Sequence, residues 1–595
     1  MVALLLVLAA IVLSPVLFAD FIRLDDHSHL FENPHLRRMS VAGLGAFWVK
    51  PYFNLYIPMT YSVWWFATMV ASLFGPLRQN AWLFHALNLA VHLANTALIF
   101  GMVQALVAAV REKPAEKAAA TDRFIALIAA LLFALHPVQV ETVAWISELK
   151  GELAMLFGLL GLWCHVRGQS SLRTALLTAL LFMAAMLSKP VAIVFPVITW
   201  LVNRVVFGVG LRKSVALPAV YATLLLPFVL VTKRLQPDTQ LDFIPGLPGR
   251  LSVAADAFTF YLSKVLAPFP LAVDYGRSPQ FVLGHMAGAR IVPAALVMLA
   301  AIAVTVSSVV RPPTLGWRRL LACGWTIFFA SIAPILGLVP FGFQQFSTVA
   351  DHYLYVPLVG ISLMVAGALS AARMGVYARA VPTAVLLVFA VLSFRQARLW
   401  RTTESLFEHT VHVNPKSYLS YYSIAQEQLS AGRLDEAIAS ATTSLSIDPG
   451  YLNAEIVIGL ARVQKGDYQE AIDRYNAVLA RNPSTVGTRA KEVSSIHNNL
   501  GTALYSVGRV GEAVEHYRKA VALFPRSLNA HLNLGNVAFE EERYADAIAE
   551  YEIAQAITPD NPAVEQRLAR ARQAARQLAP SGEVRRSYES GHFGY

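Results

Sequence analysis

The stretch WLFHALNLAVHLANTALIFGMVQALVAA, residues 82–109, contains no charged residue. A helix needs roughly 20 apolar residues to cross the hydrocarbon core of a bilayer, so this stretch is long enough to span a membrane. Its polar residues His85, Asn88, His92 and Asn95 fall within a sector of about 80° around the helix. Polar side chains in a span face the interior of a bundle, where they are functional or form hydrogen bonds between helices. We therefore predict a span within a helix bundle.

Similar apolar runs fill the first 400 residues of this 595-residue chain, which is 15% charged, whereas soluble proteins are about 25% charged. The runs predict eleven spans, at 2–19, 82–109, 124–140, 151–166, 174–187, 190–207, 214–232, 288–308, 320–339, 354–372 and 381–397. Segment 251–268 is amphipathic and contains Asp256 and Lys264, so we predict a helix that lies along the outer membrane surface.

Basic residues occur in the short loops between alternate spans, as expected if the N-terminus is cytoplasmic. They are Arg111, Lys113, Lys117 and Arg123; Arg167 and Arg173; Arg212 and Lys213; Arg311, Arg318 and Arg319; and Arg373 and Arg379. The net charge of +11 is thus explained by membrane topology and not by nucleic-acid binding. Eleven spans then place the C-terminal part and the loops 20–81, 233–287 and 340–353 outside the cytoplasm. We expect a multi-pass protein of a bacterial inner membrane with a periplasmic C-terminal part, or of the endoplasmic reticulum with a lumenal one.

The C-terminal part repeats with a period of 34 residues. Pro415, Pro449 and Pro483 are 34 apart, as are Pro525 and Pro559, and the gap of 42 between the two sets indicates an eight-residue insertion near 484–493. This is the period of tetratricopeptide repeats. The other positions that recur are Ala437, Ala471, Ala513 and Ala547; Tyr475, Tyr517 and Tyr551; Gly459, Gly501 and Gly535; and Gly432, Gly466 and Gly508.

The repeats complete an all-α fold, in which we predict a transmembrane domain over 1–399 and a tetratricopeptide-repeat domain over 400–578. The repeat domain begins with a lone helix at 400–414 and ends with a cap at 562–578, and we expect 579–595 to be disordered. Asn499 and Asn533 occupy equivalent positions in adjacent repeats. They line a groove for an acceptor peptide, or they are two solvated polar residues.

Chemistry-bearing residues recur on the side predicted to be outside. Asp25 and Asp26 follow the first span directly, and two water-facing acids there contribute little to folding. They are a catalytic pair, or a solvated loop start or helix N-cap.

Three further polar groups lie on that side. His136 and Glu141 end the third span, and Lys189 lies between the fifth and sixth, where it pairs with a phosphate or extends to the membrane surface. Asp351 and Tyr355 precede the tenth span with i, i+4 spacing, as a site or as an N-cap with an interfacial tyrosine. We predict that these groups form one shared site. His136 has no second ligand at metal spacing, and Cys164 and Cys323 lie in apolar runs, so no metal or other cofactor is expected.

The motifs together resemble a known family. They are Asp25-Asp26 with Asn33-Pro34, Tyr56-Ile-Pro58-Met-Thr60, His136-Pro-Val-Gln-Val-Glu141, Ser188-Lys189-Pro190 and Asp351-His352-Tyr353-Leu-Tyr355-Val-Pro357, followed by the repeats. In this order they are similar to the transmembrane and tetratricopeptide-repeat O-mannosyltransferases, which are GT-C-type glycosyltransferases. This chain has Leu24 where the family often has Trp, and His352 where it often has Arg.

The resemblance implies transfer of a sugar, mannose in the family, from a polyprenyl-phosphate donor to a protein hydroxyl, with inversion at the anomeric carbon. It also implies a general base in the first outer loop, Asp25 or Asp26. The donor would be bound by Tyr56, His136, Glu141, Lys189, Asp351, His352 and Tyr355. Two other functions remain open at this point: a membrane scaffold whose repeats recruit a partner protein, and a transporter of lipid-linked sugars.

Overall fold

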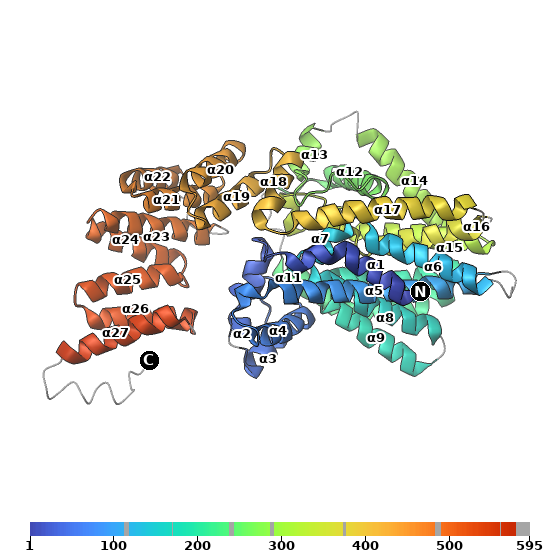
Figure 1. Cartoon of the computed structure of the whole chain (residues 1–595), viewed down its shortest axis with the longest axis horizontal. Helices are drawn as coiled ribbons and strands as arrows, with labels where there is room; N and C mark the ends of the chain where they lie inside the picture. Colours follow the sequence, from blue (N-terminus) through green and yellow to red (C-terminus); the bar gives the residue numbers. More distant parts are fainter. Residues whose placement is uncertain are drawn as a thin grey trace. The chain divides into compact units, whose positions relative to one another are not determined.

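The computed structural model describes residues 1–37, 39–111, 118–168, 171–236, 243–285, 291–372, 376–481, 489–559 and 561–578. These residues form helices and connecting turns without a named strand, so the predicted all-α fold is confirmed. The chain divides into two compact units, Met1–Ser417 and Tyr418–Tyr595 (Figure 1). The predicted disordered tail, 579–595, lies outside the described residues.

The first unit contains a helix at each of the eleven predicted spans. They are α1 (Val2–Leu13), α5 (Ala81–Ala109), α6 (Ala118–Leu135), α8 (Leu149–Arg167), α9 (Leu172–Met186), α10 (Val194–Leu201), α11 (Leu211–Leu235), α14 (Ile291–Val310), α15 (Gly316–Ile332), α16 (Pro357–Ala371) and α17 (Val376–Leu399). Within the described ranges, five stretches are long and apolar enough to cross a membrane, at Ala81–Ala109, Ile146–Arg167, Leu211–Leu235, Ile291–Val310 and Arg379–Leu399. The unit is thus that of a multi-pass membrane protein, and the total of eleven spans stays a prediction.

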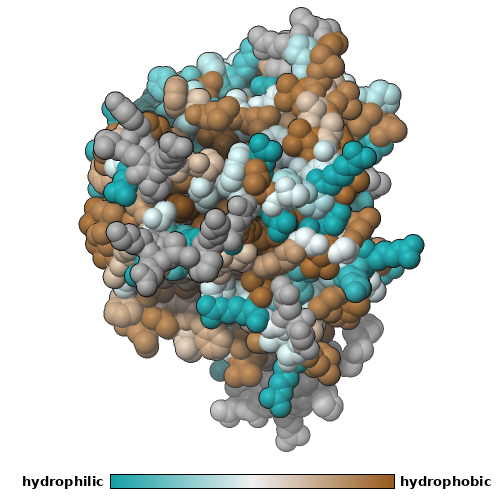
Figure 2. Space-filling view, turned by 90° about the vertical axis from the view of Figure 1, so that its right-hand side faces the viewer, coloured by the Kyte–Doolittle hydropathy of each residue, from teal (hydrophilic) through white to brown (hydrophobic). Residues whose placement is uncertain are grey.

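Close helix packing in this unit depends on glycine. A Cβ on Gly324 of α15 would lie 2.4 Å from the carbonyl oxygen of Gly360 on α16, so any larger residue would force the two helices apart. Small residues allow such close approach of membrane helices. Figure 2 shows the face at the right of Figure 1, where hydrophilic side chains project between hydrophobic ones.

The segments between the long helices are themselves mostly helical. After α1 come α2 (Pro34–Arg37), α3 (Val41–Val49) and α4 (Pro58–Ser72); further on come α7 (Gln139–Ala144), α12 (Leu247–Leu266) and α13 (Pro279–His285). The two charged residues of segment 251–268 have protein partners, and the position of this segment along the outer membrane surface stays a prediction. Asp256 is buried and paired with Arg277, and buried Lys264 donates to the carbonyl of Pro270, 2.5 Å away. Because protein groups satisfy both charges, neither residue needs a water-facing helix.

Helix α18 (Thr403–Val413) belongs to the first unit. The ring of His409 contacts the carbonyl oxygen of Leu271 at 2.9 Å, which attaches this helix to the segment after α12. The structural division at Ser417 therefore falls later in the chain than residue 399, where the predicted membrane domain ends.

The second unit consists of four helical hairpins and a final helix. The hairpins are α19 (Tyr418–Ser430) with α20 (Leu434–Ile447), α21 (Leu452–Lys465) with α22 (Tyr468–Arg481), α23 (Ala490–Ser506) with α24 (Val510–Leu523), and α25 (Leu528–Glu540) with α26 (Tyr544–Ile557), followed by α27 (Pro562–Leu578). The predicted repeat fold and its terminal helix are confirmed. Part of the predicted insertion, residues 484–488, lies outside the described residues.

The repeating glycines and tyrosines pack against each other within a hairpin. A Cβ on Gly459 would lie 2.1 Å from the ring of Tyr475, and one on Gly501 would lie 2.6 Å from the ring of Tyr517. The glycine therefore provides the space that the aromatic ring fills, which explains why the two positions recur together.

A second glycine position ends the first helix of each hairpin in a left-handed conformation. Gly432, Gly466 and Gly508 have φ of +74°, +87° and +82°, but the fourth repeat has Glu542 there, at φ +60°. A side chain in this region costs roughly 1–2 kcal/mol. We expect Glu542→Gly to raise the Tm of a fragment spanning residues 418–595 by about 2–4 °C. Gly508→Glu is the matched reverse change and should lower the Tm, and an unchanged Tm in both variants would contradict the explanation.

A histidine pair makes the third repeat sensitive to pH. The Nδ1 atoms of His497 and His516 are 2.9 Å apart, and burial lowers the pKa of both rings, that of His497 to about 4. The unfolded chain, with an ordinary histidine pKa near 6.5, therefore binds more protons than the folded one between about pH 4 and pH 6.5. The contribution of the two histidines to the free energy of unfolding is fully present above this pH window, and it is lost as the pH falls through the window. Thermal unfolding of the same fragment should show a smaller acid-induced drop in Tm for His516→Gln than for the wild type, and parallel curves would contradict this.

Candidate functional site

Hydrogen bonds at the start of α4 join distant segments of the first unit. The Thr60 hydroxyl donates to the carbonyl of Ser188 at 3.1 Å, and the Met59 amide donates to that of Leu187 at 3.3 Å. Lys189 follows directly. The predicted outer loop 20–81, in which Asp25 and Asp26 also lie, is thus attached through α4 near the predicted donor-binding lysine.

Four charged side chains form what we call the polar cluster: Asp25, Glu148, Lys150 and Lys189. Glu148 is buried; its Oε2 lies 2.7 Å from Lys189 Nζ, and its Oε1 lies 3.5 Å from Lys150 Nζ. Lys150 Nζ is also 3.7 Å from Asp25 Oδ2. The ammonium groups of Lys150 and Lys189 therefore share one buried carboxylate, and Lys150 also contacts Asp25.

The two adjacent acids have different environments. The Asp25 side chain is 42% exposed, whereas Asp26 is completely buried. Asp26 accepts hydrogen bonds from the amide and hydroxyl of Ser147, at 3.0 and 2.5 Å, and from the amide of Ile22 at 3.1 Å. Burial raises the pKa of Asp26 to about 6. The expectation that both acids face water is therefore wrong for Asp26, which holds the segment after the first span against residue 147.

A glycine and an aromatic ring adjoin the polar cluster. A Cβ on Gly151 would lie 2.8 Å from Glu148 Oε2, so glycine there leaves room for the contact between Glu148 and Lys189. Lys150 Nζ also lies 5.4 Å from the centre of the Trp145 ring, a cation–π distance.

A second group of predicted residues lies next to the polar cluster. His352 Nδ1 is 2.5 Å from Glu141 Oε1, and the His352 ring packs edge-on against Trp145. Burial lowers the pKa of His352 to about 3, and burial together with the carboxyls of Asp351 and Glu148 raises the pKa of Glu141. Both shifts disfavour the ionised forms, so burial favours a neutral pair.

Asp351 adjoins this pair but is directed to another partner. It accepts a hydrogen bond from the Tyr275 hydroxyl at 2.8 Å, and burial raises its pKa to about 7. Tyr275 was not predicted from the sequence. No motif marks it, because it follows a segment without regular periodicity.

Three predicted donor-binding residues are engaged elsewhere. The Tyr56 hydroxyl donates to the carbonyl of Trp48 at 2.9 Å. His136 is buried, with Nε2 3.1 Å from the carbonyl oxygen of Val265. The Tyr355 hydroxyl lies 3.0 Å from His92 Nδ1 and accepts from Asn95 at 3.2 Å. For His92 and Asn95 the structure thus shows the interhelical hydrogen bonds left open as one alternative.

The two predicted groove asparagines are connected through a third. Asn533 Nδ2 donates to Asn498 Oδ1 at 2.9 Å, and Asn498 Nδ2 donates to Asn499 Oδ1 at 3.1 Å. Asn499 and Asn533 are only partly buried. A row of side-chain amides therefore links adjacent repeats.

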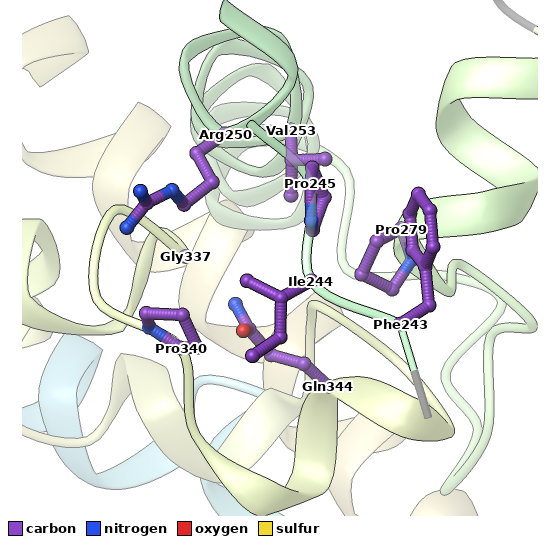
Figure 3. Close-up of a pocket in the computed structure, with 9 residues that line it drawn as sticks. All are labelled: Phe243, Ile244, Pro245, Arg250, Val253, Pro279, Gly337, Pro340 and Gln344. Carbon is purple, nitrogen blue, oxygen red and sulfur yellow. The ribbon is translucent and has the colours of Figure 1, made fainter. Parts of the chain in front are cut away.

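A small pocket lies apart from the predicted site residues. Figure 3 shows Arg250 and Gln344 among apolar side chains from residues 243–245, from α12, from the start of α13 and from the turns near Gly337 and Pro340. Arg250 donates to the carbonyl of Leu338 at 3.2 Å, so its charged group is partly engaged with the pocket wall. None of the predicted catalytic or donor-binding residues lines it.

The fold and these contacts define a class of protein: a helical membrane unit with a buried polar cluster, followed by tetratricopeptide repeats. Tetratricopeptide-repeat family models match residues 418–451, 451–526 and 498–562. Protein O-mannosyl-transferase Tmtc3 of Drosophila melanogaster is 26% identical over 233 residues, which cover 36% of this chain and 24% of that protein. The chain thus spans about a quarter of the length of this relative. These findings support the predicted resemblance to the transmembrane and tetratricopeptide-repeat O-mannosyltransferases.

Two solved structures are also similar. A thermophilic tetratricopeptide-repeat protein of Thermus thermophilus, TTC0263, is 21% identical and covers 32% of this chain and 96% of its own, with a TM-score of 0.26. Pseudomonas aeruginosa PilF is 15% identical and covers 33% of this chain and 90% of its own, with a TM-score of 0.25.

Proposed function

We propose that this protein is a GT-C-type inverting glycosyltransferase, which transfers a sugar, mannose by the resemblance, from a polyprenyl-phosphate donor to an acceptor hydroxyl. The polar cluster is the observation that carries the proposal. It combines the exposed carboxylate of Asp25 with two lysines that are paired with the single buried carboxylate of Glu148. The reaction requires a general base for the acceptor hydroxyl and cations for the departing phosphate.

Asp25 is the proposed general base. Its carboxylate is accessible and close to a cation, whereas Asp26 is committed to three hydrogen bonds. Asp25 would take the hydroxyl proton as the acceptor oxygen forms its bond to the anomeric carbon. The bond from that carbon to the phosphate oxygen breaks at the same time, and polyprenyl phosphate leaves with the electron pair.

Lys189 and Lys150 would stabilise the departing phosphate. An ammonium group has three N–H donors, and only one hydrogen bond from Lys189 Nζ, that to Glu148, is seen among the described residues. The remaining N–H groups are available to phosphate oxygens. Glu148 fixes the position of the Lys189 ammonium, and the hydrogen-bonded pair of Glu141 and His352 forms the adjacent wall.

The repeats are proposed to present the acceptor protein. Side-chain amides donate and accept hydrogen bonds with any peptide backbone, so Asn499 and Asn533 would bind an extended chain of varied sequence. This role requires that the repeats and the polar cluster lie on the same side of the membrane, outside the cytoplasm. A purely scaffolding protein would use the repeats in the same way but would not need the polar cluster.

The direct test is sugar transfer by the purified full-length protein in nanodiscs. Labelled polyprenyl-phosphate mannose and peptides containing Ser or Thr would be supplied, with polyprenyl-phosphate glucose as a parallel donor. We expect labelled peptide together with release of polyprenyl phosphate. An intact protein that binds peptide but consumes neither donor would favour the scaffold, and movement of unreacted donor between leaflets would favour the transporter.

A further inference from the structure

Helix α4 is apolar on both of its faces. One face, with Tyr61, Trp64 and Trp65, is buried against the rest of the first unit. The opposite face is exposed and also apolar. A helix that is hydrophobic all round occurs in a protein core or in a membrane, and this one is only half covered by protein.

The exposed face continues into the turn after α4 and the start of α5. It consists of six residues, which we call the apolar ridge: Phe66, Met69, Val70, Leu73, Phe74 and Trp82. The first four have the i, i+3, i+4, i+7 spacing of one helical stripe. Leu73 is 80% exposed and Phe74 is 62% exposed, and the Phe74 ring contacts the Trp82 ring edge-on.

The ridge lies in a segment without charge. No Asp, Glu, Lys or Arg occurs between Lys50 and Arg78, so these two cations flank the segment. Such flanking cations, together with tryptophan, are typical of helices at a membrane interface.

The turn at the end of the ridge satisfies its own backbone. Buried Asn80 donates through Nδ2 to the carbonyls of Ala71, Gly75 and Pro76, at 3.2, 3.2 and 3.0 Å. Carbonyl groups without a partner are costly in lipid. The two N–H groups of the Asn80 amide are shared among these three carbonyls, and those of Ala71 and Pro76 also accept from the backbone amides of Phe74 and Gln79. The turn is therefore suited to an apolar environment, although it is not α-helical.

We propose that the apolar ridge inserts into the lipid bilayer, with acyl chains as its partner, so that α4 is a membrane-embedded helix and not part of a water-exposed loop. Other apolar helices of the same unit already indicate a multi-pass membrane protein, which places a lipid surface beside this one. Because the start of α4 is hydrogen-bonded to residues 187 and 188, the inserted ridge would hold the polar cluster at the depth of the lipid headgroups. The inference does not depend on glycosyl transfer.

Site-directed spin labelling of the full chain in nanodiscs tests the proposal. In a background of Cys164→Ser and Cys323→Ala, single cysteines at Phe66, Val70 and Leu73 would carry the label. Leu299→Cys on α14 is the lipid control, because α14 is apolar enough to span a membrane. Ile553→Cys on α26 is the water control, because α26 belongs to the repeats. Both positions are exposed and apolar, like those of the ridge. None of the labelled positions belongs to the polar cluster.

We expect collisions with oxygen to dominate over collisions with a water-soluble nickel chelate at all three ridge positions, as at Leu299. A chelate accessibility like that of Ile553 would overturn the proposal. Shielding from both reagents would also overturn it, because the ridge would then be covered by protein, either by a second copy or by another part of the chain. Three labelled positions keep the test valid if one variant does not fold.

Discussion

Changing Asp25 to Asn is expected to lower the rate of sugar transfer by about 10²–10⁴-fold, the usual cost of losing a general base. The amide has the shape of the acid but does not take up a proton. Because the Asp25 side chain is substantially exposed and its contact with Lys150 is long, at 3.7 Å, the Tm should change little. Transfer from polyprenyl-phosphate donor to peptide would be measured beside thermal unfolding of the purified protein.

Asp26→Asn is the matched control for this prediction. Its Oδ1 would still accept from Ser147, but its Nδ2 would face the amide of Ile22, placing two donors against each other. Leaving a buried donor unsatisfied costs about 1–3 kcal/mol, so this variant should unfold at a lower temperature. Full activity in Asp25→Asn would exclude the proposed base, and a greater loss of Tm in Asp25→Asn than in Asp26→Asn would contradict the assignment of their roles.

Changing Lys189 to Met is expected to remove most transfer activity and also to destabilise the protein. The change leaves buried Glu148 with only the longer contact to Lys150. Breaking a buried ion pair by removing one partner costs about 3–5 kcal/mol. The single variant alone would therefore not separate a role in catalysis from a role in folding.

The double variant Lys189→Met with Glu148→Gln separates the two roles. Removing the buried acid together with the lysine eliminates the unpaired charge, so the Tm should recover toward that of the wild type. Activity should remain low, because the cation for the leaving phosphate is still absent. Recovery of both Tm and activity would show that Lys189 serves only to neutralise Glu148.

The repeat fold could be predicted in detail because its information is local. Three of the four hairpins contain their own glycine, small residue and aromatic ring, and the packing of Gly459 against Tyr475 joins residues only 16 positions apart. Apolar runs likewise predicted where the long helices occur. Segment 251–268 was harder, because the partners of Asp256 and Lys264 lie in a loop without a regular pattern.

The sequence by itself determined an apolar helical unit, the four repeats and the candidate groups Asp25-Asp26, Glu141, Lys189 and Asp351-His352. Composition and periodicity are properties of short windows, so these features are visible without a structure. The tertiary structure alone decided that Asp25 is accessible and Asp26 is buried, since burial depends on contact with Ser147, which lies 121 residues further along the chain. It also decided that Lys150 and Glu148 join Lys189, and that Tyr355 turns instead to His92. Charges separated by dozens of residues meet only when helices pack, and no sequence window contains both partners.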